Sequence, residues 1–167
     1  NPQLVLDFYN MRRREVAKAE PNAAHNMIAT LEKDFDVTIV TQNIDDLHER
    51  AGSGRVLHLH GEIFKMRSVE DEGLIKEIRG DINLGDLAPD GFQWRPHIVW
   101  FEEPVPMIVE AASIMMQADI FLLVGTSLQV YPAAGLLEYV NDWVPKYIID
   151  KKIPPVNRYR NIIPIEK

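Results

Sequence analysis

The stretch VTIVTQNIDDLHERAGSGRVLHLHGEIF, from Val37 to Phe64, decides the fold. It opens with an apolar, β-branched run at residues 37–40, which predicts a short buried strand. Polar residues 42–46 follow at once, and a second apolar run from residue 56 ends in the same way at His60. Ligands of open parallel α/β sheets bind beyond the carboxyl ends of the strands. We therefore expect two neighbouring parallel strands to bring amide, carboxylate and imidazole groups to one rim of a sheet.

Composition sets the outer limits. The chain has 167 residues, 46% of them apolar and 26% charged, which is typical of one soluble domain. A net charge of −7 argues against nucleic-acid and membrane-surface partners. No apolar run approaches the roughly 18 residues of a membrane span, and no signal peptide is evident, so we expect a cytoplasmic protein. The absence of cysteine excludes disulfides and thiolate zinc sites. The sequence does not define the oligomeric state.

Helical and strand patterns alternate along most of the chain, which predicts an α/β fold with an open parallel sheet and helices on both faces. The predicted helices cover residues 1–19, 22–34, 45–51, 105–117 and 133–140. The predicted strands cover residues 37–40, 56–60, 95–101, 120–124, 147–150 and 162–165. Residues 65–93 are the least patterned segment, with one expected helix around 74–79. We expect a core formed by residues 1–64 and 94–167, and a small insertion at 65–93.

Two later strands also end in polar groups. Gly125, Thr126 and Ser127 follow the apolar run 120–124, and such a segment offers backbone N–H groups and hydroxyls to a ribose or a phosphate. Asp150 ends the strand 147–150, where an acidic group binds a ribose hydroxyl in some dinucleotide-binding folds. A turn aspartate is the alternative interpretation of Asp150.

Tyr9 and Arg12 stand three residues apart and share one helix face. From spacing alone they indicate a basic helix surface, although a phenol beside a guanidinium could also hold a carboxylate. His58 and His60 alternate on a strand, so they share a face and could form a two-histidine ligand set. No third ligand is evident nearby, and we expect no metal.

Set in order, the segments TQNID, the HG at residues 60–61, VWF and GTSLQVYPAAG resemble the sirtuin family of NAD-dependent protein-lysine deacylases. The resemblance runs from Pro2 to about Asp150 and implies a Rossmann-like NAD-binding core. Tyr9 and Arg12, within FYNMRR, resemble the signature of the class III, sirtuin-5-like branch. That branch removes succinyl, malonyl or glutaryl groups, so the resemblance favours the carboxylate interpretation of this pair.

The resemblance also implies roles for the candidate site residues. In the family's reaction the acyl amide oxygen attacks the anomeric carbon of the nicotinamide ribose and expels nicotinamide. The final products are lysine and O-acyl-ADP-ribose. His60 would be the general base, because an imidazole titrates near working pH. On the cofactor, Asn43 and Asp45 would bind the nicotinamide side, Gln42 the ribose, and Ile44 would line the pocket.

The remaining implied roles concern the far end of the cofactor and the substrate. Gly125, Thr126 and Ser127 would hold the adenosine side, and Asp150 stands where the family often has asparagine. The backbone of the acylated lysine substrate would lie between two segments, as an added strand. These segments are Val99, Trp100 and Phe101 on one side and Val130 and Tyr131 on the other.

Four departures from the family pattern affect these expectations. The glycine-rich opening segment does not precede Asn1, as if the chain were truncated, so we expect this chain alone to bind NAD weakly. The two zinc-binding cysteine pairs are missing, as in some bacterial members; Arg67 and Ser68 stand near the first pair, and packing alone should hold the insertion. Glu102 replaces a glycine and could block the substrate or repel an acidic acyl group, although Glu102 and Glu103 also fit a solvated loop. After Asp150 the sequence diverges, which leaves the adenine pocket undefined.

The leading hypothesis is an NAD-dependent protein deacylase, with desuccinylase or demalonylase activity and no zinc. The alternative is a non-catalytic sirtuin-like module that binds acyl-lysine peptides or ADP-ribose. A third, weaker hypothesis is a metal-dependent hydrolase that uses His58 and His60.

Overall fold

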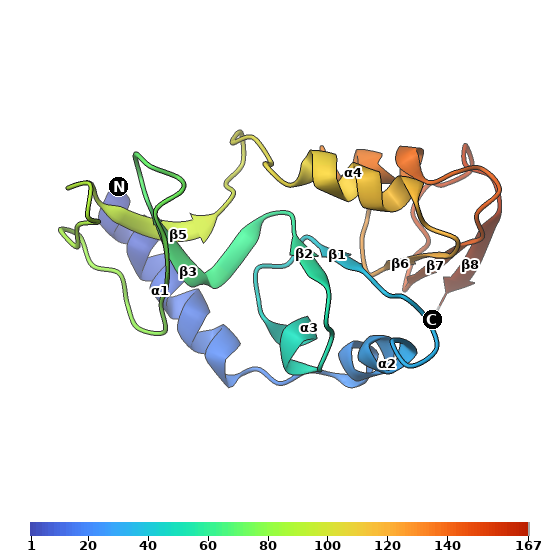
Figure 1. Cartoon of the computed structure of the whole chain (residues 1–167), viewed down its shortest axis with the longest axis horizontal. Helices are drawn as coiled ribbons and strands as arrows, with labels where there is room; N and C mark the ends of the chain where they lie inside the picture. Colours follow the sequence, from blue (N-terminus) through green and yellow to red (C-terminus); the bar gives the residue numbers. More distant parts are fainter. Residues whose placement is uncertain (167) are drawn as a thin grey trace. The chain divides into compact units, whose positions relative to one another are not determined.

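A computed structural model describes residues 1–166, which fall into two compact units, residues 1–104 and residues 105–166. Each unit contains parallel strands together with helices, in agreement with the predicted α/β class (Figure 1). The division into residues 1–64, 65–93 and 94–167 remains a prediction, and one strand, β3 (Gly61–Ser68), runs across its boundary at residue 64.

The first unit contains the two strands predicted within the deciding stretch. β1 (Ile39–Thr41) and β2 (Val56–His58) pair in parallel, with Thr41 opposite His58. The helices α2 (Ala23–Leu31) and α3 (Leu47–Arg50) contact each other beside them. Asn22 caps α2, because its side chain accepts from backbone N–H groups of the first turn.

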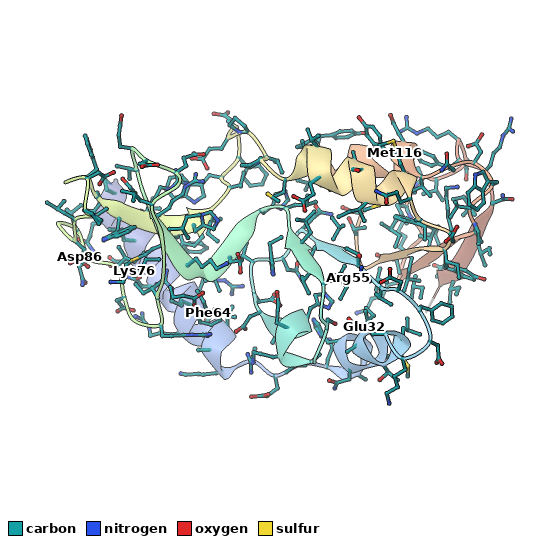
Figure 2. All side chains as sticks on the ribbon, in the orientation of Figure 1. Glu32, Arg55, Phe64, Lys76, Asp86 and Met116 are labelled. Carbon is teal, nitrogen blue, oxygen red and sulfur yellow. The ribbon has the colours of Figure 1, made fainter. Side chains whose placement is uncertain are left out.

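The same unit carries an antiparallel sheet in which β3 lies between β4 (Ile75–Glu77) and β5 (Trp94–Ile98). Helix α1 (Pro2–Lys18) contacts β3 and β5 (Figure 1). The helix expected around residues 74–79 is wrong, because this segment forms β4 (Ile75–Glu77). Six residues make too short a helix to be stable by themselves, whereas the edge of β3 offers backbone partners at once. Lys76 of β4 and Phe64 of β3 are labelled in Figure 2.

Buried polar side chains of α1 bind backbone groups of β3 and of the segment after β4. The Arg13 side chain is 1% exposed and donates to the carbonyl oxygens of Ile63 at 2.8 Å and Gly80 at 3.1 Å. Asn10 donates to the carbonyl oxygen of Ile82 and accepts from its N–H, both at 2.9 Å. A guanidinium and an amide thus satisfy backbone groups that packing alone would leave unpaired.

Further polar contacts hold residues 65–93, so the expectation that packing alone holds this insertion is wrong. Arg67 is buried, with its guanidinium 3.2 Å from the carboxylate of Glu72 and 3.7 Å from that of Glu103. The Ser68 hydroxyl donates to the Asp90 carboxylate at 2.5 Å. Apolar packing adds to these contacts through a cluster of Leu6, Met66, Ile82, Ala88 and Trp94.

The second unit is built on a parallel sheet of order β6–β7–β8, formed by β6 (Phe121–Val124), β7 (Lys146–Asp150) and β8 (Ile162–Glu166). Helix α4 (Ile108–Met116) contacts η1 (Ala133–Tyr139). The helix expected at 133–140 is therefore present as a 3₁₀ helix. Within residues 1–166, no helix is both long and apolar enough to span a bilayer.

Candidate active site

The segments that follow β1 and β2 lie against each other, as the sequence predicts. The carbonyl oxygen of Gln42 is 3.1 Å from Nδ1 of His60. The carbonyl oxygen of Ile44 accepts from the N–H of Ile63 at 2.7 Å. These contacts bring the candidate residues 42–45 and His60 together at one rim of the parallel pair.

The contact with Gln42 fixes the tautomer of His60. A carbonyl oxygen can only accept a hydrogen bond, so Nδ1 of the His60 ring must carry the proton. In the neutral ring Nε2 then holds the lone pair, and it has no hydrogen-bond partner among the described residues. The backbone of Gln42 therefore orients the imidazole as a base.

Asn43 and Asp45 are placed by the turn into α3. The N–H of Asn43 donates to the Thr41 hydroxyl at 3.1 Å, and the Asp45 carboxylate accepts from the N–H of Leu47 at 3.1 Å. Asn43 is exposed, and Asp45 and Ile44 are half-buried. This part of the rim thus offers an amide and a carboxylate next to His60.

His58 takes part in a different set of contacts. Its Nδ1 lies 3.1 Å from the carbonyl oxygen of Asn43, and its Nε2 lies 2.7 Å from the Glu49 carboxylate. Both ring nitrogens are therefore engaged, and a metal could bind His58 only after one contact breaks. Within residues 1–166, no three histidine or carboxylate side chains gather as a possible metal site. These contacts disfavour the metal-dependent hydrolase.

The predicted strand 95–101 ends early, at Ile98, so its last three residues lie outside β5. The N–H of Val99 donates to the carbonyl oxygen of His60 at 2.9 Å, which ties this candidate substrate segment to the candidate base. The chain turns at once, because the N–H of Glu103 donates to the carbonyl oxygen of Trp100 at 3.1 Å. Phe101, in this turn, is 89% exposed.

Glu102 occupies the turn with φ of +73°, a left-handed conformation that suits the glycine of the family pattern. We expect the Glu102→Gly variant to raise the free energy of unfolding by about 1 kcal/mol, because glycine removes the Cβ strain. Urea denaturation measures this change. Glu70→Gly is the control: Glu70 has no positive φ, so glycine there should destabilise. A Glu102→Gly variant no more stable than the parent would contradict the argument.

Tyr9 and Arg12 lie on α1, and their environments differ. The Tyr9 ring stacks with that of Trp100 at a centroid distance of 6.1 Å, and burial raises the pKa of its phenol, which keeps it a neutral donor. Arg12 is about half exposed and donates to the Glu15 carboxylate at 2.7 Å. A substrate carboxylate would have to compete with Glu15, but exposed ion pairs contribute only up to about 1 kcal/mol.

The candidate residues of the second unit follow β6 and β7. Gly125 has φ of +63°, with no atom within 4 Å of where a Cβ would stand, and its N–H donates to the carbonyl oxygen of Ile149. The Thr126 hydroxyl accepts from the N–H of Leu128 at 3.3 Å. Asp150 accepts from the N–H of Lys152 at 3.1 Å, the geometry expected of a turn aspartate. Its ribose-binding role therefore remains a prediction.

The other three candidates in this unit are Ser127, Val130 and Tyr131. Val130 is 40% exposed and Tyr131 is 67% exposed, so both side chains are accessible from solvent. Ser127 stands directly before Leu128, whose φ is +55°. Their roles toward cofactor and substrate remain predictions.

The sequence does not single out Glu103 and Arg95, which lie near the site. It favours a solvated loop for Glu103, but the Glu103 carboxylate accepts hydrogen bonds from both terminal guanidinium nitrogens of Arg95, at 2.7 and 3.0 Å. The sequence separation of eight residues across a turn gives no periodic signal for such a pair.

The rim of β1 and β2 suits the nicotinamide–ribose end of NAD. It offers an oriented imidazole for ribose hydroxyls and, through Asn43 and Asp45, hydrogen-bonding groups for a carboxamide. Gly125 leaves room for close approach of a ligand to the backbone after β6. The described residues therefore fit NAD at two places, the rim of β1 and β2 and the backbone after β6.

Several known proteins are similar to this chain in sequence or in structure. The profile of the Sir2 family matches residues 1–132. An NAD-dependent protein deacylase of Helicobacter pylori (strain J99) is 52% identical over 162 residues, which cover 97% of this chain and 69% of that protein. A protein of the same name from Bacteroides thetaiotaomicron is 47% identical over 173 residues, which cover all of this chain and 74% of that protein.

Solved structures of Sir2 proteins are also similar to this chain. A Sir2 homologue in complex with NAD superposes with a TM-score of 0.88 at 32% identity, over 98% of this chain and 66% of that one. Sir2Tm bound to a propionylated peptide gives a TM-score of 0.81 at 29% identity, over 97% of this chain and 73% of that one.

The fold is thus a Rossmann-like α/β fold with a polar rim suited to a nucleotide sugar, as predicted. The chain belongs to the Sir2 family, which confirms the sirtuin resemblance. The more specific likeness to the class III branch remains a prediction.

Proposed function

We propose that this chain is an NAD-dependent protein-lysine deacylase that prefers succinyl and malonyl groups. The deacylase activity is supported by the similar proteins of Helicobacter pylori and Bacteroides thetaiotaomicron, which are both named NAD-dependent protein deacylase. The observation that carries the proposal is the hydrogen bond from Nδ1 of His60 to the Gln42 carbonyl oxygen, which leaves Nε2 as a base beside residues 42–45. The cytoplasmic location remains a prediction.

NAD, when bound, supplies the anomeric carbon whose bond to nicotinamide is broken in the reaction. His60 accepts a proton from a ribose hydroxyl at Nε2 while the Gln42 carbonyl oxygen holds the ring in place. Asn43 and Asp45 bind the carboxamide, and Ile44 lines its pocket. The groups at Gly125, Thr126 and Ser127 bind the adenosine side.

The substrate is an acylated lysine in a protein segment, in line with the propionylated peptide bound by Sir2Tm. Its backbone binds to residues 99–101 as an added strand, whose hydrogen bonds depend little on sequence. Val130 and Tyr131 are the other candidate residues for contact with the substrate backbone. The phenol of Tyr9 donates to the distal carboxylate of the acyl group. Arg12 leaves Glu15 and pairs with the same carboxylate.

The acyl preference is tested by the Arg12→Met variant. We expect kcat/KM toward a succinyl-lysine peptide to fall by at least about tenfold, because a charge-assisted hydrogen bond is lost. Activity toward the matching acetyl-lysine peptide should stay within about threefold, because that group carries no charge. Nicotinamide release with each peptide gives both values.

Arg14→Met is the matched control on the same helix. Arg14 is similarly exposed and pairs with Asp81 at 2.7 Å, away from Tyr9. This variant should keep the succinyl-to-acetyl ratio of the parent. Equal losses on the two peptides in Arg12→Met would overturn the carboxylate interpretation while leaving the deacylase activity intact.

The non-catalytic module is the competing outcome. It requires that the natural full-length protein bind acyl-lysine peptide or ADP-ribose without releasing nicotinamide from NAD.

A further inference from the structure

A partly buried ion pair lies next to the turn at residues 100–103. Arg95 donates to both oxygens of the Glu103 carboxylate, at 2.7 and 3.0 Å, and the side chains are 12% and 28% exposed. Arg95 also donates to the carbonyl oxygen of Ile98 at 3.0 Å, at the end of β5. Two parallel charge-assisted bonds fix both the position and the plane of the guanidinium.

The same pair fixes Trp100 in two ways. The Glu103 carboxylate accepts from the backbone N–H of Trp100 at 2.8 Å. The guanidinium carbon of Arg95 lies 3.5 Å from the centroid of the Trp100 ring, a close cation–π contact. Backbone and indole of Trp100 therefore both depend on one carboxylate.

Trp100 in turn sets the position of Tyr9. Their rings stack at an interplanar angle of 26°, and Tyr9 also meets Phe8 edge to face at 5.1 Å. Tyr9 lies on α1, whose polar side chains Asn10 and Arg13 anchor it to the backbone of the first unit. These anchors hold α1 without help from Trp100. The contact with Trp100 therefore affects the orientation of the Tyr9 ring and not the position of the helix.

We propose that Glu103 is a positioning residue for acyl selection, which aligns the Tyr9 phenol through Arg95 and Trp100. This inference rests on the proposed function, because it assigns the phenol to the acyl carboxylate. In this role Glu103 acts through Arg95 and Trp100, with which its carboxylate makes hydrogen bonds. Its effect should therefore appear in the choice between acyl groups rather than in the NAD reaction.

The charge of Glu103 suits this role. Partial burial would raise the pKa of its carboxyl group, but hydrogen bonds from Arg95 and from the Trp100 N–H, together with the charges of Arg95 and Arg67, bring the pKa below its ordinary value. The carboxylate thus stays ionised at neutral pH. Glutamine keeps the shape but can accept at only one atom, so it cannot bind both guanidinium nitrogens.

The test compares Glu103→Gln with the parent, in the natural full-length protein, on succinyl-lysine and acetyl-lysine peptides of one sequence. We expect kcat/KM for the succinyl peptide to fall about tenfold, mainly through KM, because small misplacements of a binding group are costly. The acetyl value should fall less than about threefold, and KM for NAD should not change. Glu103→Asp should recover part of the succinyl activity.

Glu72→Gln is the matched control. It removes another carboxylate from the same network, the 3.2 Å contact with Arg67, without touching Trp100. Its succinyl-to-acetyl ratio should equal that of the parent. If Glu103→Gln also keeps the parent ratio, or if Glu72→Gln changes the ratio equally, the positioning role is wrong. Absence of NAD-dependent activity in the parent on both peptides would instead refute the proposed function itself.

Discussion

Replacing Gly61 with alanine is expected to destabilise the first unit by several kcal/mol, enough to lower the yield of folded protein sharply. A Cβ at this position would stand 2.0 Å from the carbonyl oxygen of His97 and 2.9 Å from its carbonyl carbon. Both are backbone atoms, so no side chain can move aside. Gly61 also has φ of +84°, which disfavours any residue with a Cβ.

The position explains why the strain cannot be relieved locally. Gly61 pairs with Ile98 at the start of β3, directly after His60. Any shift that accommodates a methyl group must move β5 or the His60 backbone. Alanine should therefore reduce both stability and activity.

Urea denaturation followed by circular dichroism measures the change in free energy. Gly80→Ala is the control, because a Cβ there meets no atom within 4 Å and the φ of Gly80 is not positive. That variant should match the parent within about 0.5 kcal/mol. A Gly61→Ala protein as stable as the Gly80→Ala protein would show that the two strands do not approach as described.

The His60→Asn variant should lose at least about a hundredfold in kcat, because removal of a general base typically costs that much. The asparagine amide can still donate to the Gln42 carbonyl oxygen, so the fold and the affinity for the acyl peptide should change little. Nicotinamide release gives kcat, and peptide titration gives the affinity.

His25→Asn provides the matched control. His25 completes the cap of α2, with Nδ1 3.3 Å from the backbone nitrogen of Asn22, and takes no part in the rim. Its loss should cost a little stability and leave kcat near the parent value. A His60→Asn protein with nearly normal kcat would assign the base to another residue.

The rim at His60 could be predicted from sequence because it follows from local patterns. Two short apolar runs with polar ends indicate parallel strands, and parallel strands put their carboxyl ends at the same edge. The Asn22 cap and the left-handed Gly52, with φ of +101°, are similarly local. Such features need no knowledge of distant partners.

The errors concern segments whose structure depends on strand pairing or on a turn that no periodic pattern in the sequence marks. Residues 75–77 form β4 because they pair with β3, and that pairing overrides a weak local helical preference. Residues 99–101 leave the strand because of the turn at Glu102. The Arg95–Glu103 pair is specific to this turn, and sequence alone could not distinguish it from solvated charges.

The most direct measurement is product analysis after the natural full-length protein is incubated with NAD and a succinyl-lysine peptide. The account predicts equal amounts of free nicotinamide, unmodified lysine peptide and O-succinyl-ADP-ribose, none of which form without NAD, and a lower rate with the acetyl peptide. Absence of nicotinamide release with either peptide, from protein shown to be folded, would contradict it.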